Sequence, residues 1–173
     1  MKLRDVIVFN ETYQVPEHVQ RIDSKRTHGW QLRYGSTKMF SDHSNDGSGA
    51  LVSLTEAVNE LHRRIDKLPA PSGLRADIAA RKSTELPVGI SRPAPRLRKG
   101  RRAYEHIFMV SVPRGDNSST NKSVYIGTDN TVTAEREAEA LAKAIGIRDK
   151  AVREHKAMKT KVKRAGQHIV ELR

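Results

Sequence analysis

Residues 123–145 read Ser123-Val-Tyr-Ile-Gly-Thr-Asp-Asn-Thr-Val-Thr-Ala-Glu-Arg-Glu-Ala-Glu-Ala-Leu-Ala-Lys-Ala-Ile145, and this stretch predicts a strand, a turn and an amphipathic helix. The β-branched and aromatic residues 124–126 favour a strand, and Gly127 followed by Asp129-Asn130 favours a turn. Thr133 is placed to cap a helix whose first turns are rich in glutamate, the charge that a helix N-terminus prefers. Apolar residues then recur at helical spacing, which predicts a helix face that covers a sheet: Ala134, Ala138, Leu141, Ala142 and Ile145.

The strands of that sheet are predicted upstream of this stretch. Tyr104–Val112 is rich in strand-forming residues, and Val88–Arg92 is a shorter strand candidate. The polar segment Pro113–Asn121 is predicted to be a hairpin loop. The expected unit is three antiparallel strands followed by one helix.

This unit resembles the Apetala-two (ethylene-response-factor) DNA-binding domain in its bacterial and phage form. The resemblance rests on Gly89-Ile-Ser-Arg92, on Phe108-Met-Val-Ser-Val112, and on Val124-Tyr-Ile-Gly-Thr128 followed by an alanine-rich helix. It extends over residues 86–148. Members of this family lay a three-stranded sheet in the major groove of DNA and support it with the helix. The resemblance implies that Arg92, Arg114, Ser111 and Tyr125 face DNA.

Residues 27–66 show the same order of elements and are interpreted as a diverged, weaker copy of the unit. Two strands are expected at Gly29–Tyr34 and Lys38–Phe40, followed by a polar loop and a helix at 56–65 that Ser53 or Thr55 caps. The apolar positions of this helix are Leu54, Ala57, Val58, Leu61 and Ile65. Alternation along the strands predicts that Gln31, Arg33 and Lys38 project from the face opposite Trp30, Leu32 and Tyr34. Arginine and glutamine have the hydrogen-bonding groups that bind guanine and adenine edges in the major groove.

The expected fold class is therefore α+β, with two tandem units that each contain a three-stranded antiparallel sheet and one helix. Short strands at Val6–Phe9 and Tyr13–Val15 are expected to precede the first unit, and the polar run Arg21–Thr27 is expected to interrupt them. The predicted organisation is an N-terminal strand with the first unit over 1–68, a linker over 69–86, the second unit over 87–148 and a basic C-terminal helix or tail over 149–173. Two helical turns are expected near 74–82.

Positive charge is concentrated in the second half of the chain. The formal net charge is +12, and residues 87–173 hold 19 Lys and Arg against 9 Asp and Glu, a net of +10. Arg92–Arg102 contains six basic residues in eleven positions, and prolines at 93 and 95 keep it extended. A surplus of this size indicates a polyanionic partner, most often nucleic acid. The residues expected to contact phosphates are Arg96, Arg98, Lys99, Arg101 and Arg102.

The composition argues against catalysis and against a bound cofactor. The chain contains no cysteine, and its seven histidines lack the spacing of a metal site, so no metal ligand is predicted. Asp42 and Asp46 lie in a Gly/Ser-rich loop and are expected to be solvated. No apolar run has the length of a membrane span, so we expect a protein of the cytoplasm, associated with the nucleoid, without a membrane partner.

We therefore expect a sequence-specific protein that binds double-stranded DNA, either a transcriptional regulator or an accessory factor of a phage or mobile element. A structured-RNA or ribosome-associated protein would share the charge, and a protein–protein adaptor could use the apolar helices. Whether the chain forms a homodimer stays open.

Overall fold

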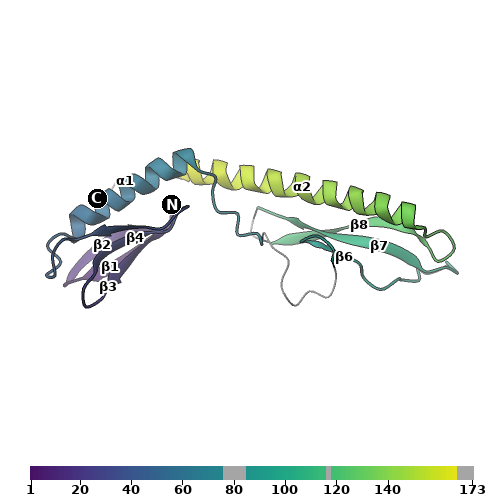
Figure 1. The fold of residues 1–173 in the computed structure, drawn as a ribbon, viewed down its shortest axis with the longest axis horizontal. Helices are drawn as coiled ribbons and strands as arrows, with labels where there is room; N and C mark the ends of the chain where they lie inside the picture. Colours follow the sequence, from purple (N-terminus) through teal and green to yellow (C-terminus); the bar gives the residue numbers. More distant parts are fainter. Residues whose placement is uncertain (76–84, 116–117, 167–173) are drawn as a thin grey trace. The chain divides into compact units, whose positions relative to one another are not determined.

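The computed structural model describes residues 1–75, 85–115 and 118–166, which form an α+β protein with three small antiparallel sheets and two helices (Figure 1). The α+β class is therefore confirmed. The elements in chain order are β1 (Leu3–Val8), β2 (Glu11–Pro16), β3 (Val19–Asp23), β4 (His28–Leu32), β5 (Lys38–Ser41), α1 (Ala50–Lys67), β6 (Ile90–Ser91), β7 (Glu105–Pro113), β8 (Ser119–Thr128) and α2 (Ala134–Ala165).

The chain divides into two compact units. Unit 1 comprises Met1–Pro71 and the residues from Lys159 onward, and unit 2 comprises Ser72–Met158. Each half of the chain contains three antiparallel strands followed by a helix: β3, β4 and β5 before α1, and β6, β7 and β8 before α2. The predicted pair of units with one sheet each is not fully correct, because β1 and β2 form a separate two-stranded sheet in unit 1.

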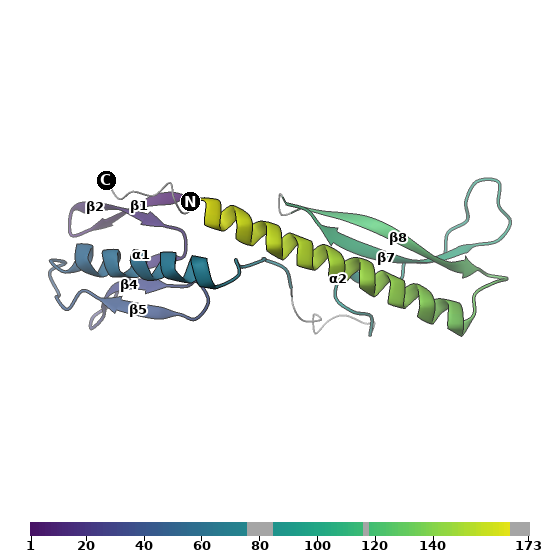
Figure 2. The same cartoon turned by 90° about the horizontal axis from the view of Figure 1, so that it is seen from above.

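The core of unit 1 lies between α1 and the strands beside it. All five predicted apolar positions of α1 are buried, and so are Trp30, Leu32 and Tyr34, as alternation predicted. The Trp30 indole Nε1 donates a hydrogen bond of 2.8 Å to the carbonyl of Ala50, the first residue of α1. Seen from above, β1 and β2 lie to one side of α1 and β5 lies to the other (Figure 2).

The predicted start of α1 is wrong. The helix begins at Ala50 with Gly49 at its N-cap, and no side chain caps it. Ser53 is a buried residue inside the helix, and its hydroxyl donates a hydrogen bond of 2.5 Å to Asp42 Oδ1. The hydroxyl that was expected to cap the start of the helix therefore holds the preceding loop against it.

A second correction concerns β3, which lies partly in the polar run expected to interrupt the strands. Arg21 in β3 is only 7 % exposed, and its guanidinium lies 2.6 Å from Asp42 Oδ2 and 5.1 Å from the centre of the Trp30 ring. Asp42 is fully buried in this ion pair, so the expectation that it is solvated is also wrong. Arg21 pairs with Asp23 as well, at 2.8 Å. Because both charges are compensated, a strand that reads as polar can line the core.

The last turns of α2 complete unit 1. The Ala70 N–H donates to Thr160 Oγ1 at 3.0 Å, Arg164 Nη2 donates to the carbonyl of Asp66 at 2.8 Å, and Lys163 pairs with Glu17 at 2.8 Å.

Unit 2 buries one face of its sheet against α2. Thr133 precedes the first helical residue, and its Oγ1 accepts a hydrogen bond of 3.3 Å from the Arg136 N–H, which confirms the predicted N-cap. The predicted apolar stripe is correct for Leu141 and Ile145 but shifted for the alanines, since Ala134, Ala138 and Ala142 are exposed. Ala140 and Ala144 are buried instead, in a cluster with Ile90, Phe108, Val110, Val124 and Ile126.

The helix is longer and the hairpin loop is shorter than predicted. α2 passes through Gly146, where no heavy atom lies within 4 Å of the position that a Cβ would occupy. A glycine inside a helix costs about 1 kcal/mol relative to alanine, which good helix formers on both sides offset. β7 extends to Pro113 and β8 begins at Ser119, so both strands enter the segment expected to be loop. The two helical turns expected near 74–82 lie mostly outside the described residues.

One side chain of α2 reaches the central strand of the sheet, β7. Arg148 Nη1 donates to the carbonyl of Ser111, and burial lowers the pKa of its guanidinium. Gly89, with φ of +80°, lies directly beneath it, and a Cβ at this position would approach Arg148 Nε to 2.6 Å. Glycine is therefore favoured here by its left-handed backbone, and a side chain at this position would also have to displace the end of Arg148.

Replacing Asp42 with alanine leaves the buried Arg21 guanidinium with Asp23 as its remaining carboxylate. We expect the free energy of unfolding of unit 1 to fall by about 3 kcal/mol, the lower end for breaking a buried ion pair. Trp30 is the single tryptophan of the chain, so its fluorescence in a urea titration reports on this unit. Asp46→Ala, which removes an exposed carboxylate from the same loop, should cost less than about 1 kcal/mol. Equal losses in the two variants would show that the buried pair is not what stabilises unit 1.

Glu60 on α1 should make unit 1 sensitive to acid. Its hydrogen bonds with Arg63 and Arg64 lower the pKa of this carboxyl from 4.5 to about 2. A carboxyl whose pKa is lowered in the folded state stabilises the protein at pH values above its ordinary pKa. This contribution is lost as the pH falls from 4.5 towards 2. Over that pH range we expect the free energy of unfolding of Glu60→Gln to fall by about 1 kcal/mol less than that of the unsubstituted protein. A urea titration at each pH measures this difference. Glu56→Gln, on the same helix, should follow the unsubstituted protein; a Glu60→Gln curve that also did so would contradict the assignment.

Candidate nucleic-acid interface

The sheet of unit 2 has one face covered by α2 and an opposite face that carries polar groups. Figure 1 shows α2 along one side of β7 and β8. Phe108 pairs with Val124 and Val110 pairs with Ile90 on the covered side. Because side chains alternate along a strand, the neighbouring residues point to the other side, which we call the outer face. The outer face carries Ser91, Ile107, Met109, Ser111, Asn121, Ser123 and Tyr125.

Two residues that the resemblance placed against DNA lie on this outer face. Ser111 pairs with Asn121, and Tyr125 pairs with Ile107. Tyr125 is 55 % exposed although it stands in the middle of a strand whose neighbours Val124 and Ile126 are buried. An exposed aromatic ring on a face that also carries hydroxyl and amide groups can contact a ligand through stacking and hydrogen bonds.

Arg92 does not share that face. It follows β6 at a position where alternation turns it towards α2, and its Nη1 forms an ion pair with Glu137 of that helix. Sequence reasoning placed Arg92 by resemblance alone and had no means of finding Glu137, which is 45 positions away in the sequence.

The basic segment after β6 is partly neutralised by one carboxylate. Arg96 and Glu105 form an isolated antiparallel bridge through their backbones, with N–O distances of 3.1 and 2.9 Å. Arg98 Nε lies 2.6 Å from Glu105 Oε2, and Arg96 Nε lies 3.9 Å from the same oxygen. Glu105 therefore fixes the path of this segment and reduces the positive charge that Arg96 and Arg98 present.

Arg101 and Arg102 meet Tyr125 at the end of the strands. Together with Ala103, Glu105 and Thr128 they line a hollow of about 460 Å³, which we call the Tyr125 pocket. A turn closed by the Arg101 N–H and the carbonyl of Arg98, at 3.0 Å, precedes the pocket and exposes Lys99. The structure thus brings two predicted phosphate contacts and one predicted base contact into a single site.

The end of the hairpin beside this pocket is fixed by Asp129. Its carboxylate accepts hydrogen bonds from the Tyr104 N–H at 3.1 Å and lies 2.8 Å from His106 Nε2. The hydrogen bond with His106 is the main reason why the pKa of Asp129 is lowered. This pair supports the strand ends that carry the pocket.

Arg114 lies at the opposite end of the hairpin from the Tyr125 pocket. Its N–H donates to the carbonyl of Ser118 at 2.8 Å, next to the Pro113–Ser119 pair that ends the ladder. The other end of the ladder is the Glu105–Thr128 pair, so β7 separates the two sites by roughly 26 Å at the usual rise per residue. Arg114 and the pocket can contact one ligand only if that ligand is extended.

In unit 1, Gln31 and Arg33 are brought together and Lys38 is not. Arg33 Nε donates to Gln31 Oε1 at 2.6 Å, whereas Lys38 pairs with Leu32 and its ammonium lies 4.8 Å from the centre of the Phe40 ring. Lys38 is therefore on the side of Leu32 and Phe40, contrary to the predicted common face.

Three further polar residues, in β3 and in the turn after it, were not among the predicted site residues. Gln20 pairs with Gln31 across β3 and β4 and is exposed, and Lys25 and Arg26 are exposed in the turn between these strands. Gln20 could have been found by alternation if β3 had been recognised as a strand.

The described residues were also considered as ligands of a metal ion and as parts of a membrane-spanning helix. Within the described ranges, no group of three or more His, Asp or Glu side chains is arranged to hold a metal ion. No helix in the part of the chain that the structure describes has the length and apolar character needed to cross a membrane.

Comparisons with protein-family models, with curated proteins and with solved structures find no match to this chain.

Proposed function

We propose that the protein binds double-stranded DNA in a sequence-specific way, with the outer face of the β6–β7–β8 sheet in the major groove. The observation that carries this proposal is the position of Tyr125, an exposed aromatic residue on a sheet face that also carries hydroxyl and amide groups, beside Arg101 and Arg102. A sheet face with hydroxyl, amide and aromatic groups can contact base edges, while guanidinium groups at its border contact phosphates.

The charges that remain uncompensated support phosphate contacts at one end of the sheet. Arg92, Arg96 and Arg98 pair with carboxylates, which reduces the attraction that they exert on a polyanion. Lys99, Arg101 and Arg102 are exposed in the same segment. We therefore assign the phosphate contacts chiefly to these three residues, and we assign Arg96 and Arg98 chiefly to the positioning of the segment.

The proposal extends to unit 1 through Gln31 and Arg33. These residues lie on the side of the β3–β4–β5 sheet opposite α1, and Gln20, Lys25 and Arg26 add polar and basic groups nearby. Two DNA-binding sheet faces on one chain bind a longer site more tightly than either face alone. Once the first face is bound, the second meets the DNA at a high effective concentration. A regulator of transcription, or an accessory factor of a phage or mobile element, would use such binding.

One observation favours a structured RNA as a second candidate partner. The Tyr125 ring is exposed at the border of a pocket, and aromatic rings in such positions stack on unpaired bases in RNA loops. Competition between duplex DNA and a folded RNA for the protein separates the two candidates.

Removing Arg101 and Arg102 together should weaken duplex binding and reduce its dependence on salt. Each phosphate contact contributes about 0.9 to the slope of log K against log salt, so the double alanine variant should lower the slope by about 1.8. The measurement is fluorescence anisotropy of a labelled duplex at several salt concentrations.

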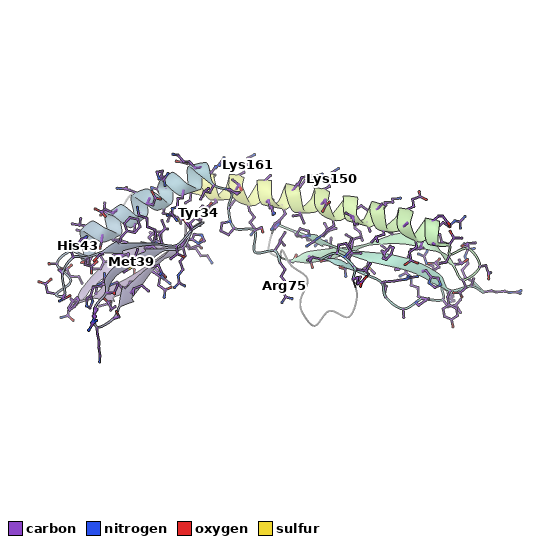
Figure 3. All side chains as sticks on the ribbon, viewed as in Figure 1. Tyr34, Met39, His43, Arg75, Lys150 and Lys161 are labelled. Carbon is purple, nitrogen blue, oxygen red and sulfur yellow. The ribbon has the colours of Figure 1, made fainter. Side chains whose placement is uncertain are left out.

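The matched control is the double alanine variant of Lys143 and Lys150. Both residues are exposed on one face of α2, and Lys150 points away from the sheet (Figure 3). This variant loses the same charge and should keep most of the slope. Equal decreases in the two double variants would show that net charge alone governs binding, and would contradict the assigned surface.

A selection of random duplexes by the protein, with competitor RNA present, should enrich one motif of about ten or more base pairs. Arg33→Ala should relax the preference at one position of this motif and lower affinity for the preferred base about 10-fold, because a bidentate contact is lost.

Lys38→Ala is the control within the same sheet, since Lys38 lies on the other side of it. It should leave the selected motif unchanged. Binding without enrichment of any motif, or binding that RNA abolishes at equal concentration, would contradict sequence-specific recognition of DNA.

A further inference from the structure

The Tyr125 pocket is a concave site, whereas a sheet face that contacts the major groove of DNA does not need a pocket. Its volume of about 460 Å³ is in the range of small-molecule sites, and it lies entirely within unit 2. Side chains from a loop and from the ends of two strands line it. The loop provides Arg101 and Arg102, β7 provides Glu105, and β8 provides Tyr125 and Thr128.

The groups around the pocket differ in charge, which orients a ligand. The two arginines favour a phosphate on their side. Glu105, whose Oε2 is buried beside Arg98 and Arg96, lines the pocket with a carboxylate, a group that accepts hydrogen bonds. The Tyr125 ring provides an apolar surface against which a planar group can stack. A phosphate, a planar ring and a hydrogen-bond donor on that ring are the features of a nucleotide.

A base inside a duplex cannot satisfy all of these groups. Its two faces are covered by neighbouring bases, so it cannot stack on Tyr125, although its major-groove edge can still be contacted. Its Watson–Crick donors are used by the opposite strand, so they cannot reach Glu105. An unpaired base has both a free face and free donors, and the cost of leaving the stack is smallest where no partner base exists. Guanine offers two adjacent N–H donors to a carboxylate.

From this arrangement we infer that the Tyr125 pocket binds a single unpaired nucleotide, with a preference for guanine. Its base stacks on Tyr125 and donates to Glu105, and its phosphate is held by Arg101 and Arg102. The inference rests on the proposed binding of duplex DNA and adds to it a site for a nucleotide that leaves the duplex, at a bulge, a junction or an end.

The experiment compares three labelled duplexes of the same sequence by fluorescence anisotropy at constant salt. The first is fully paired, the second carries one bulged guanine, and the third carries one bulged thymine. We expect the bulged guanine to bind about 10-fold more tightly than the paired duplex, the gain typical of stacking one base on an aromatic side chain. The bulged thymine should gain less.

Variants of exposed tyrosines connect the gain to the pocket. Tyr125→Ala should abolish the ratio between bulged and paired duplex, and Tyr125→Phe, which keeps the ring, should retain it. Tyr104→Ala is the matched control, because Tyr104 is 47 % exposed and does not line the pocket. Glu105→Gln should reduce the ratio of guanine to thymine.

Two results would overturn the inference. The first is equal affinity for the paired and the bulged duplexes; if the paired duplex still binds with a steep salt dependence, the proposed function stands without the nucleotide site. The second is an advantage of the bulge that persists in Tyr125→Ala, which would mean that another part of the protein recognises the bulge. Loss of binding to all three duplexes by the unsubstituted protein would contradict the proposed function itself.

Discussion

The burial of Phe108, Val110, Val124 and Ile126 against α2 is the contact on which the rest of unit 2 depends. Strand side chains alternate, so fixing these residues on one side of the sheet places Ser111, Ser123 and Tyr125 on the other. Neither set can move without the other, because a slip of one residue would expose the apolar side chains and bury the polar ones. The polar face is thus held in place by the hydrophobic core behind it, and its side chains need no contacts of their own to keep their orientation.

Charge compensation then determines which basic residues remain available. The segment from Arg92 to Arg102 is uniformly basic in the sequence, yet Glu137 and Glu105 engage its first three arginines. Exposed ion pairs of this kind stabilise little, but they hold a proline-containing loop in one path. Within this segment, the ion pairs of Arg92, Arg96 and Arg98 leave Lys99, Arg101 and Arg102 as the better candidates for phosphate contacts. The loop is held at Arg96 and Arg98 by Glu105, and its charged residues follow at 99–102. Because part of the loop is already held, less conformational entropy is lost when its charged residues contact phosphates.

The sequence allowed much of the fold to be predicted where local patterns are sufficient. The buried face of α1, the Thr133 cap, the alternation of β4 and the presence of β7 follow from spacing and residue type. What could not be predicted depends on partners far away in the chain. β3 appears polar because Arg21 and Asp23 are charged, and only the fold shows that Asp42 compensates Arg21 inside the core. In the candidate site, the family resemblance named Ser111 and Tyr125 together, and both lie on the outer face. No local pattern indicates that Arg92 meets Glu137 or that Arg101 and Arg102 line a pocket with Tyr125.

Thr160, Lys163 and Arg164 belong to unit 1, although all of unit 2 precedes them in the chain. In topological terms, unit 2 is an insertion into unit 1. A ribosome synthesises the strands and helix of unit 1 first but supplies these three contacts only after unit 2 has been made. During synthesis, unit 1 must persist without them while unit 2 emerges. For the same reason no single cut in the chain separates the two units intact, and a fragment ending at Pro71 lacks part of the surface that covers the end of α1.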